Sequence, residues 1–321
     1  MNNDTTKGVK NMSNIVIQLT KEAQQKVHAH YTPYKVERNA PGVVFAAKAN
    51  GVSITSYRSG KVMFQGGRAA EEAQQFGIPN PSKNVTSSKG DTLPEDFASK
   101  SVIGSDETGT GDYFGPITVA AVYVPAHQIE LVKELGVKDS KMLTDDFMRK
   151  IAPDLIKTLT YSLLILHNPK YNEVQAKGWS QGKIKAVLHN QALKKVLAKI
   201  APEKPEAILI DQFAERNTYY NHLKNEKEIV RENVLFATKA EQLHLSVAAA
   251  SIIARYAFLR EMDRLSKEVG VTLPKGASAK VDEVAAQILL TQGEDALYEV
   301  TKWHFANTTK ASRIASKKRL I

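Results

Sequence analysis

Two adjacent acids stand next to a glycine-rich segment in the first half of the chain. Asp106 and Glu107 follow a short apolar run, and a segment with three glycines, 109–115, separates them from a second apolar run at 117–124. The pattern predicts a strand, an exposed loop and a second strand. Carboxylates bind hard cations and glycine allows close approach of an anion, so the segment suits a metal ion and a phosphate. An ordinary hairpin with a solvated acidic tip would give the same pattern, and this segment alone leaves both open.

Two further acids follow predicted strands far along the chain. Residues 207–211 are continuously apolar until Asp211, which is typical of a strand buried on both faces. An aspartate at that position could also simply cap the following turn. Glu241 comes after another predicted strand, 233–237, and shortly before a predicted helix that runs from 245 to about 267. Taken singly, Glu241 is better explained as a partner of that helix's dipole.

The amino-terminal part is predicted to be a small separate unit. Residues 14–77 read as strand, helix, three strands and helix, with hairpin chemistry between the middle strands. Residues 1–80 hold ten Lys and Arg and five Asp and Glu, so ten minus five gives +5 of the chain's total of +10. The cations on or near the strands, Lys48, Arg58 and Lys61, indicate a sheet surface that follows a nucleic-acid backbone. The alternative is rings packed in a core and cations in water.

Composition limits the possible classes of protein. The chain of 321 residues is long enough for two domains, and a Pro- and Ser-rich stretch predicts a linker at 81–100 between domains at 1–80 and 101–321. No apolar run approaches the roughly 20 residues of a membrane span, and the first residues lack a signal's apolar core, which predicts a cytoplasmic protein. The absence of cysteine excludes disulfides and thiolate metal sites. A net charge of +10 favours a polyanionic partner over a merely solvated basic surface.

Several separated motifs together resemble one known family. The acid and glycine segment 104–116, Asp139-Ser140-Lys141, the run ending at Asp211, and Lys239-Ala240-Glu241 followed by the alanine-rich segment 248–255 occur in the order seen in bacterial ribonuclease HIII, one of the type 2 ribonucleases H. The amino-terminal unit also resembles that family's additional domain, which is similar to half of a TATA-box binding protein. The resemblance spans nearly the whole chain.

The resemblance implies an α/β protein with a ribonuclease H-like fold, built on a mixed five-stranded sheet. It implies four carboxylates, Asp106, Glu107, Asp211 and Glu241, that are both catalytic residues and ligands of two Mg²⁺ or Mn²⁺ ions. The implied reaction is endonucleolytic hydrolysis of the RNA strand of RNA–DNA hybrids, giving 5′-phosphate and 3′-hydroxyl ends. The sister family, ribonuclease HII, has Asp in place of Glu241 and Gly-Arg-Gly in place of 109–111, so both differences favour ribonuclease HIII. A monomer is expected.

Substrate contacts are implied at two further places. Gly109, Thr110 and Gly111 are expected to enter the hybrid's minor groove and sense ribose 2′-hydroxyl groups, with Tyr113 as a less direct match. Ser140 and Lys141 are expected to hold a phosphate. The alternatives are ribonuclease HII-like activity on embedded ribonucleotides, a DNA nuclease or transposase-like enzyme, and a non-catalytic hybrid-binding protein.

Overall fold

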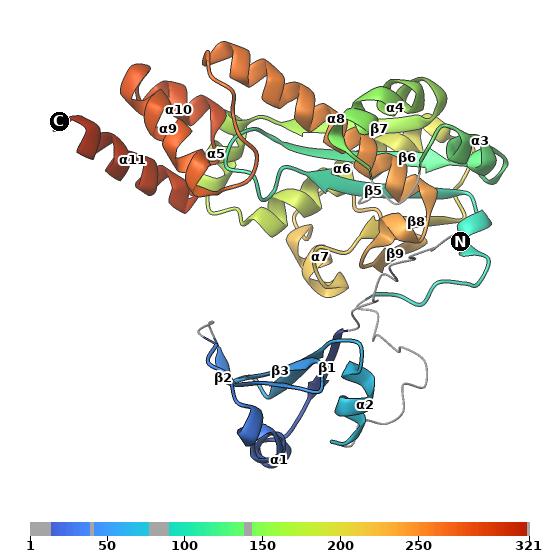
Figure 1. Ribbon diagram of the computed structural model, residues 1–321. Helices are drawn as coiled ribbons and strands as arrows, with labels where there is room; N and C mark the ends of the chain where they lie inside the picture. Colours follow the sequence, from blue (N-terminus) through green and yellow to red (C-terminus); the bar gives the residue numbers. More distant parts are fainter. Residues whose placement is uncertain (1–13, 39–41, 77–89, 138–142, 320–321) are drawn as a thin grey trace, which may run out of the picture. The chain divides into compact units, whose positions relative to one another are not determined.

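The computed structural model describes residues 14–38, 42–76, 90–137 and 143–319 (Figure 1). The chain divides into two compact units, residues 1–86 and 87–321. Each unit has its own sheet and its own hydrophobic core. In the part of the chain that is described, no helix is long and apolar enough to cross a membrane.

The amino-terminal unit is one antiparallel sheet with helices on one face. Its elements follow the order strand, helix, three strands, helix that the sequence predicts: β1 (Asn14–Gln18), α1 (Lys21–Tyr31), β2 (Val43–Ala49), β3 (Val52–Tyr57), β4 (Lys61–Gln65) and α2 (Ala69–Gln74), with a short 3₁₀ turn η1 (Thr32–Tyr34) after α1. The strands lie in the order β1-β4-β3-β2. Thr20 caps α1 by accepting a hydrogen bond from the Ala23 N–H at 3.3 Å.

The two faces of this sheet differ in character. Val27 and Tyr31 of α1 pack with Ile54 and Phe64 in the core, so the Phe64 ring serves packing. Side chains alternate along a strand, so residues next to these face away from the helices. Among them, Lys48, Ser53 and Gln65 pair across β2, β3 and β4 in one row. Lys61 lies on the same face, and Lys48, Arg58 and Lys61 are all exposed.

The second unit is built on a mixed five-stranded sheet, which confirms the predicted fold. The strands are β5 (Val102–Thr108), β6 (Ile117–Val124), β7 (Thr160–Leu166), β8 (Ala207–Asp211) and β9 (Val234–Ala237), and they lie in the order β7-β6-β5-β8-β9. The pairs β5–β6 and β6–β7 are antiparallel, whereas β5–β8 and β8–β9 are parallel. The strand that carries Asp106 is therefore the central strand.

Helices cover both faces of this sheet (Figure 1). α6 (Gln181–Ile200) packs against Ile117 and Val119 of β6, and α8 (Leu245–Glu268) packs against Ala120 and Val122 on the other face, with α4 (Asp145–Thr158) beside it. The approach of α8 to β5 is close: a Cβ on Gly104 would lie 2.3 Å from the Val247 nitrogen. The sequence prediction of a small-residue helix next to the sheet is confirmed.

The remaining elements connect these layers, and some of them escape sequence patterns. The other helices are α3 (Ile129–Glu134), α5 (Asn168–Ala176), α7 (Arg216–His222), α9 (Ala279–Thr291), α10 (Glu294–Val300) and α11 (Ala306–Arg319), with 3₁₀ turns η2 (Phe97–Ser99), η3 (Ala126–Gln128) and η5 (Ala240–Gln242). Two helices after residue 280 were too few a prediction, since three lie there. α4 contains Pro153, which by sequence rules predicts a break rather than a helix.

Candidate active site

The two acids of the glycine segment lie within β5 and point to opposite faces of the sheet. The sequence predicts them at the start of a loop, but pairing with β6 continues to Thr108, which lies opposite Thr118. Successive side chains of a strand alternate between faces. Asp106 therefore faces α8, where Ser251 is its hydrogen-bond partner, and Glu107 faces α6.

Glu107 is held by two basic side chains of α6. Its Oε1 accepts from Lys185 Nζ at 2.9 Å, and its Oε2 lies 2.9 Å from His189 Nε2. The other ring nitrogen of His189, which is fully buried, lies 2.8 Å from the Ser105 hydroxyl. Burial raises the pKa of Glu107, but His189 and Lys185 outweigh it and bring the pKa below its ordinary value. Sequence reasoning missed both residues, although their spacing of four puts them on one helix face.

Asp211 joins Asp106 on the α8 face of the sheet. β8 runs parallel to β5 with Gly104 opposite Leu209 and Ser105 opposite Ile210, so Asp106 and Asp211 follow as the next pair. Asp106 Oδ1 accepts from the Glu107 N–H at 2.7 Å, and Asp211 Oδ1 accepts from the Ala240 N–H at 3.0 Å. The buried strand that ends in an acid, as the sequence predicts, is confirmed as an element.

Glu241 is placed by a tight turn after β9. Lys239, with φ +56°, adopts the left-handed conformation that is uncommon for residues other than glycine. The chain then forms η5, in which Glu241 is 7% exposed and is the neighbour of the residue that donates to Asp211. Glu241 is thus not a partner at the start of α8, which begins at Leu245 after the His244 cap.

The carboxylates repel one another. Burial, followed by the negative charges of Glu107 and Asp211, raises the pKa of Asp106 to about 8, against the opposing hydrogen bond from Ser251. Burial also raises the pKa of Asp211; the Ala240 N–H opposes this, while the charges of Glu241 and Glu107 add to it. All four acids therefore lie within electrostatic reach of one another.

The donor set fits a hard divalent cation. It consists of carboxylate oxygens, and the raised pKa values of Asp106 and Asp211 mark negative charge that a cation would neutralise. Among the described residues, however, no three His, Asp or Glu side chains are already gathered around one point in a way that could hold an ion. The contacts of Glu107 explain part of this, because Lys185 and His189 hold its carboxylate on the α6 face.

The glycine segment forms a tightly held loop after β5. Gly109 has φ +96°, and a Cβ there would lie 2.2 Å from the Pro116 carbonyl oxygen, so no other residue fits. Gly111 is exposed and has no atom within 4 Å of a hypothetical Cβ. Thr110, partly exposed between them, accepts a hydrogen bond from Gln181 Nε2 through its carbonyl at 2.8 Å. Backbone is therefore accessible at the tip of the loop.

Two other predicted substrate contacts have different outcomes. The Tyr113 side chain is fully buried, and its hydroxyl lies 3.0 Å from Thr308 Oγ1. A side chain so placed offers no surface to a substrate, so the structure does not support the predicted contact. Ser140 and Lys141 lie outside the described residues.

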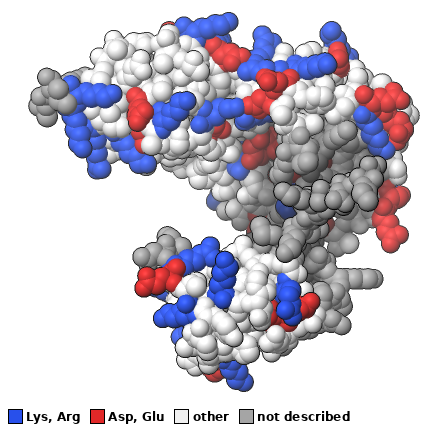
Figure 2. All heavy atoms as spheres, viewed as in Figure 1, with Lys and Arg blue, Asp and Glu red and all other residues white. Residues whose placement is uncertain are grey.

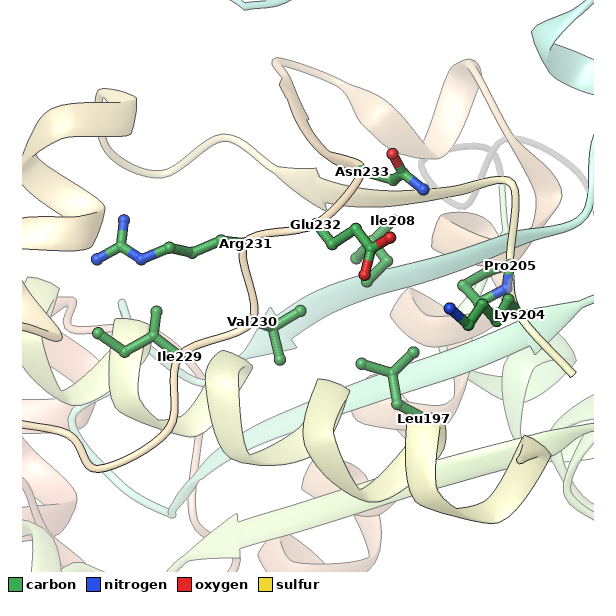
Figure 3. A pocket seen from close by; sticks show the side chains of 9 residues that line it. All are labelled: Leu197, Lys204, Pro205, Ile208, Ile229, Val230, Arg231, Glu232 and Asn233. Atoms are coloured by element: carbon green, nitrogen blue, oxygen red, sulfur yellow. The ribbon is translucent and has the colours of Figure 1, made fainter. Parts of the chain in front are cut away.

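A second cleft lies at the opposite end of β8. It has a volume of about 340 Å³ and is lined by Leu197 at the end of α6, Lys204, Pro205, Ile208 and the segment 229–233 (Figure 3). Ile208 is at the start of β8, whereas Asp211 is its last residue. The cleft is therefore separate from the carboxylates.

Comparison with known proteins agrees with this geometry. The family described as "Ribonuclease HII" matches residues 103–308, and a "Domain of unknown function (DUF3378)" matches residues 14–89. The chain is 62% identical to ribonuclease HIII of Lysinibacillus sphaericus over 307 residues, covering 94% of this chain and 100% of that protein. It is 53% identical to ribonuclease HIII of Bacillus subtilis over 313 residues, covering 96% and 100%.

Solved structures show the same relationship. The structure of Bst-RNase HIII in complex with Mn²⁺ superposes with a TM-score of 0.69 at 48% identity, covering 95% of this chain and 100% of that one. Ribonuclease H2 from Pyrococcus horikoshii OT3, at 24% identity and a TM-score of 0.52, shares the fold over 68% of this chain and 98% of that one. The mixed sheet and its acidic strand ends are thus those of a type 2 ribonuclease H.

Within that class, the near full-length similarity is to ribonucleases HIII. The chain belongs to the ribonuclease HIII family and is a ribonuclease of the ribonuclease H type.

Proposed function

We propose that this enzyme hydrolyses the RNA strand of RNA–DNA hybrids endonucleolytically, with Asp106, Glu107, Asp211 and Glu241 as catalytic residues and metal ligands. The observation that carries the proposal is the adjacency of Asp106 and Asp211 at the ends of two parallel strands, each with a raised pKa. Groups with pKa values shifted by burial and like charge are typical of catalytic sites.

Each carboxylate has a position that suits a distinct role. Two Mg²⁺ or Mn²⁺ ions, when bound, would activate a water and stabilise the leaving oxygen, which leaves 5′-phosphate and 3′-hydroxyl ends. Asp106, on the central strand, is the residue proposed to serve both ions. Glu107 and Asp211 would each serve one, and Glu241 the outer one or its water. Glu107 must leave Lys185 to do so, which makes that ion pair part of the resting state.

The glycine loop next to the carboxylates is proposed to select RNA. A ribose 2′-hydroxyl is the group by which a protein distinguishes RNA from DNA at one position. The tip at Thr110 and Gly111 presents backbone without a bulky side chain, and it follows Thr108 at the end of the acidic strand. Ser140 and Lys141 stay predicted phosphate contacts.

The amino-terminal unit is proposed to grip the hybrid through its open sheet face. Lys48 and Lys61 are exposed there, on the side away from α1 and α2. Lys and Arg side chains are also visible on this unit in Figure 2. Cations that contact phosphates release bound counterions, so their contribution to affinity falls as salt rises.

A cleavage assay with three substrates tests the catalytic proposal. Labelled RNA–DNA hybrid, duplex DNA and duplex RNA are offered with Mg²⁺ or Mn²⁺, and only the hybrid is expected to be cut, in the RNA strand. Asp211→Asn is expected to abolish cleavage, whereas Glu173→Gln, an exposed acid paired with Lys170 and Lys177, serves as the control. Absence of hybrid cleavage by the wild-type enzyme, or its persistence in Asp211→Asn, contradicts the proposal.

The same assay separates the alternatives. Cleavage of a DNA duplex at one embedded ribonucleotide indicates ribonuclease HII-like activity, and cleavage of duplex DNA indicates a DNA nuclease. Tight hybrid binding without cleavage indicates a non-catalytic binding protein.

Paired charge removal tests the proposed grip. Lys48→Gln with Lys61→Gln is expected to weaken hybrid binding and to reduce the slope of log affinity against log salt by about 1 to 2. The control, Lys21→Gln with Lys26→Gln, removes the same charge from exposed positions on α1. Equal effects of the two double variants would show that net charge, and not the sheet face, governs binding. Deletion of residues 1–80 is expected to give the larger loss in the same direction.

A further inference from the structure

Lys302 is a fully buried lysine in the segment between α10 and α11. Its backbone pairs with the end of the glycine loop: the Lys302 N–H donates to the Tyr113 carbonyl at 2.8 Å, and the Gly115 N–H donates to the Val300 carbonyl at 2.9 Å. The segment that precedes α11 is therefore joined to the loop by a short antiparallel ladder, in which Phe114 lies opposite Thr301.

The Lys302 ammonium binds the same loop from inside. Nζ donates to the Asp112 carbonyl at 2.8 Å and to the Gly115 carbonyl at 2.5 Å. Asn168 Nδ2 donates to the Gly115 carbonyl as well, at 2.9 Å. Burial lowers the pKa of Lys302 to about 7, opposed by the charge of Asp112, which shows the desolvation that this placement costs. An apolar side chain would fill the space without that cost, so what the amine adds is its pair of hydrogen bonds to the loop.

These bonds determine which way the loop presents its polar groups. The carbonyls of Thr110, Asp112, Tyr113 and Gly115 all accept hydrogen bonds from other parts of the unit. Within the described residues, the N–H groups of Thr110 and Gly111 donate to no other residue. A loop whose carbonyls are bound on the protein side has its N–H groups left for a substrate.

We propose that Lys302 is a positioning residue for substrate recognition, which holds the glycine loop by two carbonyls so that the Thr110 and Gly111 N–H groups meet the hybrid. The inference rests on the proposed function of the loop. Lys302 touches neither the carboxylates nor the substrate, so its removal is expected to change hybrid recognition and to leave metal binding intact.

The test compares Lys302→Met with a matched control. Methionine keeps the length and apolar stem but loses both hydrogen bonds. The control, Asn172→Leu, disrupts the same carboxy-terminal segment without touching the loop, because Asn172 binds the Thr301 carbonyl at 2.9 Å and the Trp303 N–H at 3.0 Å. Thermal unfolding shows how far each variant is destabilised.

Three readouts then separate positioning from stability. Lys302→Met is expected to raise KM for the hybrid about tenfold with a smaller change in kcat, since two hydrogen bonds that orient the loop are lost. The preference for an all-ribose strand over a strand with one 2′-deoxynucleotide beside the cleaved bond is expected to fall. The Mn²⁺ affinity measured calorimetrically is expected to stay unchanged. Asn172→Leu is expected to retain the wild-type KM and preference.

The outcomes are distinguishable from failure of the proposed function. If the wild-type enzyme does not cut hybrids, the proposed function fails, and Lys302→Met is then compared with wild type by hybrid binding in Ca²⁺. If wild type cuts hybrids but Lys302→Met and Asn172→Leu share the same KM and preference, Lys302 is only structural and the inference is overturned. If Lys302→Met does not fold, Asn168→Leu, which removes the other donor to the Gly115 carbonyl, is expected to shift KM in the same direction, and an unchanged KM rejects the inference.

Discussion

Two glycines of one loop are expected to respond in opposite ways to the same substitution. Gly109 has φ +96°, and its Cβ would lie 2.2 Å from the Pro116 carbonyl oxygen and 3.0 Å from Phe258 Cδ2. Gly111 has no atom within 4 Å of a hypothetical Cβ and no left-handed backbone angle. One added methyl group therefore meets backbone at Gly109 and open space at Gly111.

The magnitudes follow from these contacts. For Gly109→Ala, roughly 1 kcal/mol comes from the backbone conformation and about 1–3 kcal/mol from overpacking against a carbonyl that cannot move aside, a total of roughly 2–4 kcal/mol lost from the free energy of unfolding. For Gly111→Ala the change is within about 0.5 kcal/mol, as for most surface substitutions. If the loop contacts a ribose, Gly111→Ala is nevertheless expected to weaken hybrid cleavage, because the methyl group lies where the substrate must approach.

Tryptophan fluorescence is a suitable assay of stability. Both tryptophans of the chain, Trp179 and Trp303, belong to the second unit, so urea unfolding followed by their emission reports on the unit that carries the loop. Hybrid cleavage at saturating and limiting substrate supplies the second measurement. Equal stability of Gly109→Ala and wild type would refute the steric argument. Wild-type kinetics in Gly111→Ala would refute the assigned role of the loop tip.

Two further predictions concern charges. Lys185→Met is expected to tighten Mn²⁺ binding to the substrate-free enzyme about fivefold, because an ion pair worth about 1 kcal/mol no longer competes for Glu107; Lys183→Met is the control on the same helix, and calorimetry that finds equal affinities contradicts this. Arg255 lowers the pKa of Asp145 from 3.8 to about 2, so the stability that Asp145 contributes is present above about pH 3.8 and is lost as pH falls through about 2. Urea unfolding is expected to show Asp145→Asn about 1–2 kcal/mol less stable than wild type at pH 6 and nearly equal to it near pH 2, and a gap that does not depend on pH rejects the pairing.

Local patterns were sufficient for most individual elements of the fold. The strands that end at Asp211 and Ala237, the long helices α6 and α8, and the hairpins of the amino-terminal unit all appear where the sequence predicts them. Apolar periodicity and turn residues act over a few positions, and they are therefore readable without tertiary context. Helices with a proline inside, such as α4, or with few apolar positions, such as α7, lack that local signal.

The candidate site divides in the same way. The four acids could be named from motifs in the sequence, since each follows or lies in a recognisable apolar run. Their opposite facing could not, because it depends on how far the β5–β6 pairing continues, and this carried Asp106 and Glu107 into the strand. The burial of Tyr113 against Thr308 likewise depends on a helix almost two hundred residues away.

The sequence by itself determined the chemistry of this protein: oxygen ligands without sulfur, a glycine loop beside them and a basic charge. Only the tertiary structure decided which basic groups accompany that chemistry. Lys185 and His189 reach Glu107 because α6 packs on the face to which that side chain points, and Lys302 reaches the glycine loop because a segment near the carboxy terminus pairs with it. Contacts between residues so far apart in the chain arise from packing, which no local pattern of residues encodes.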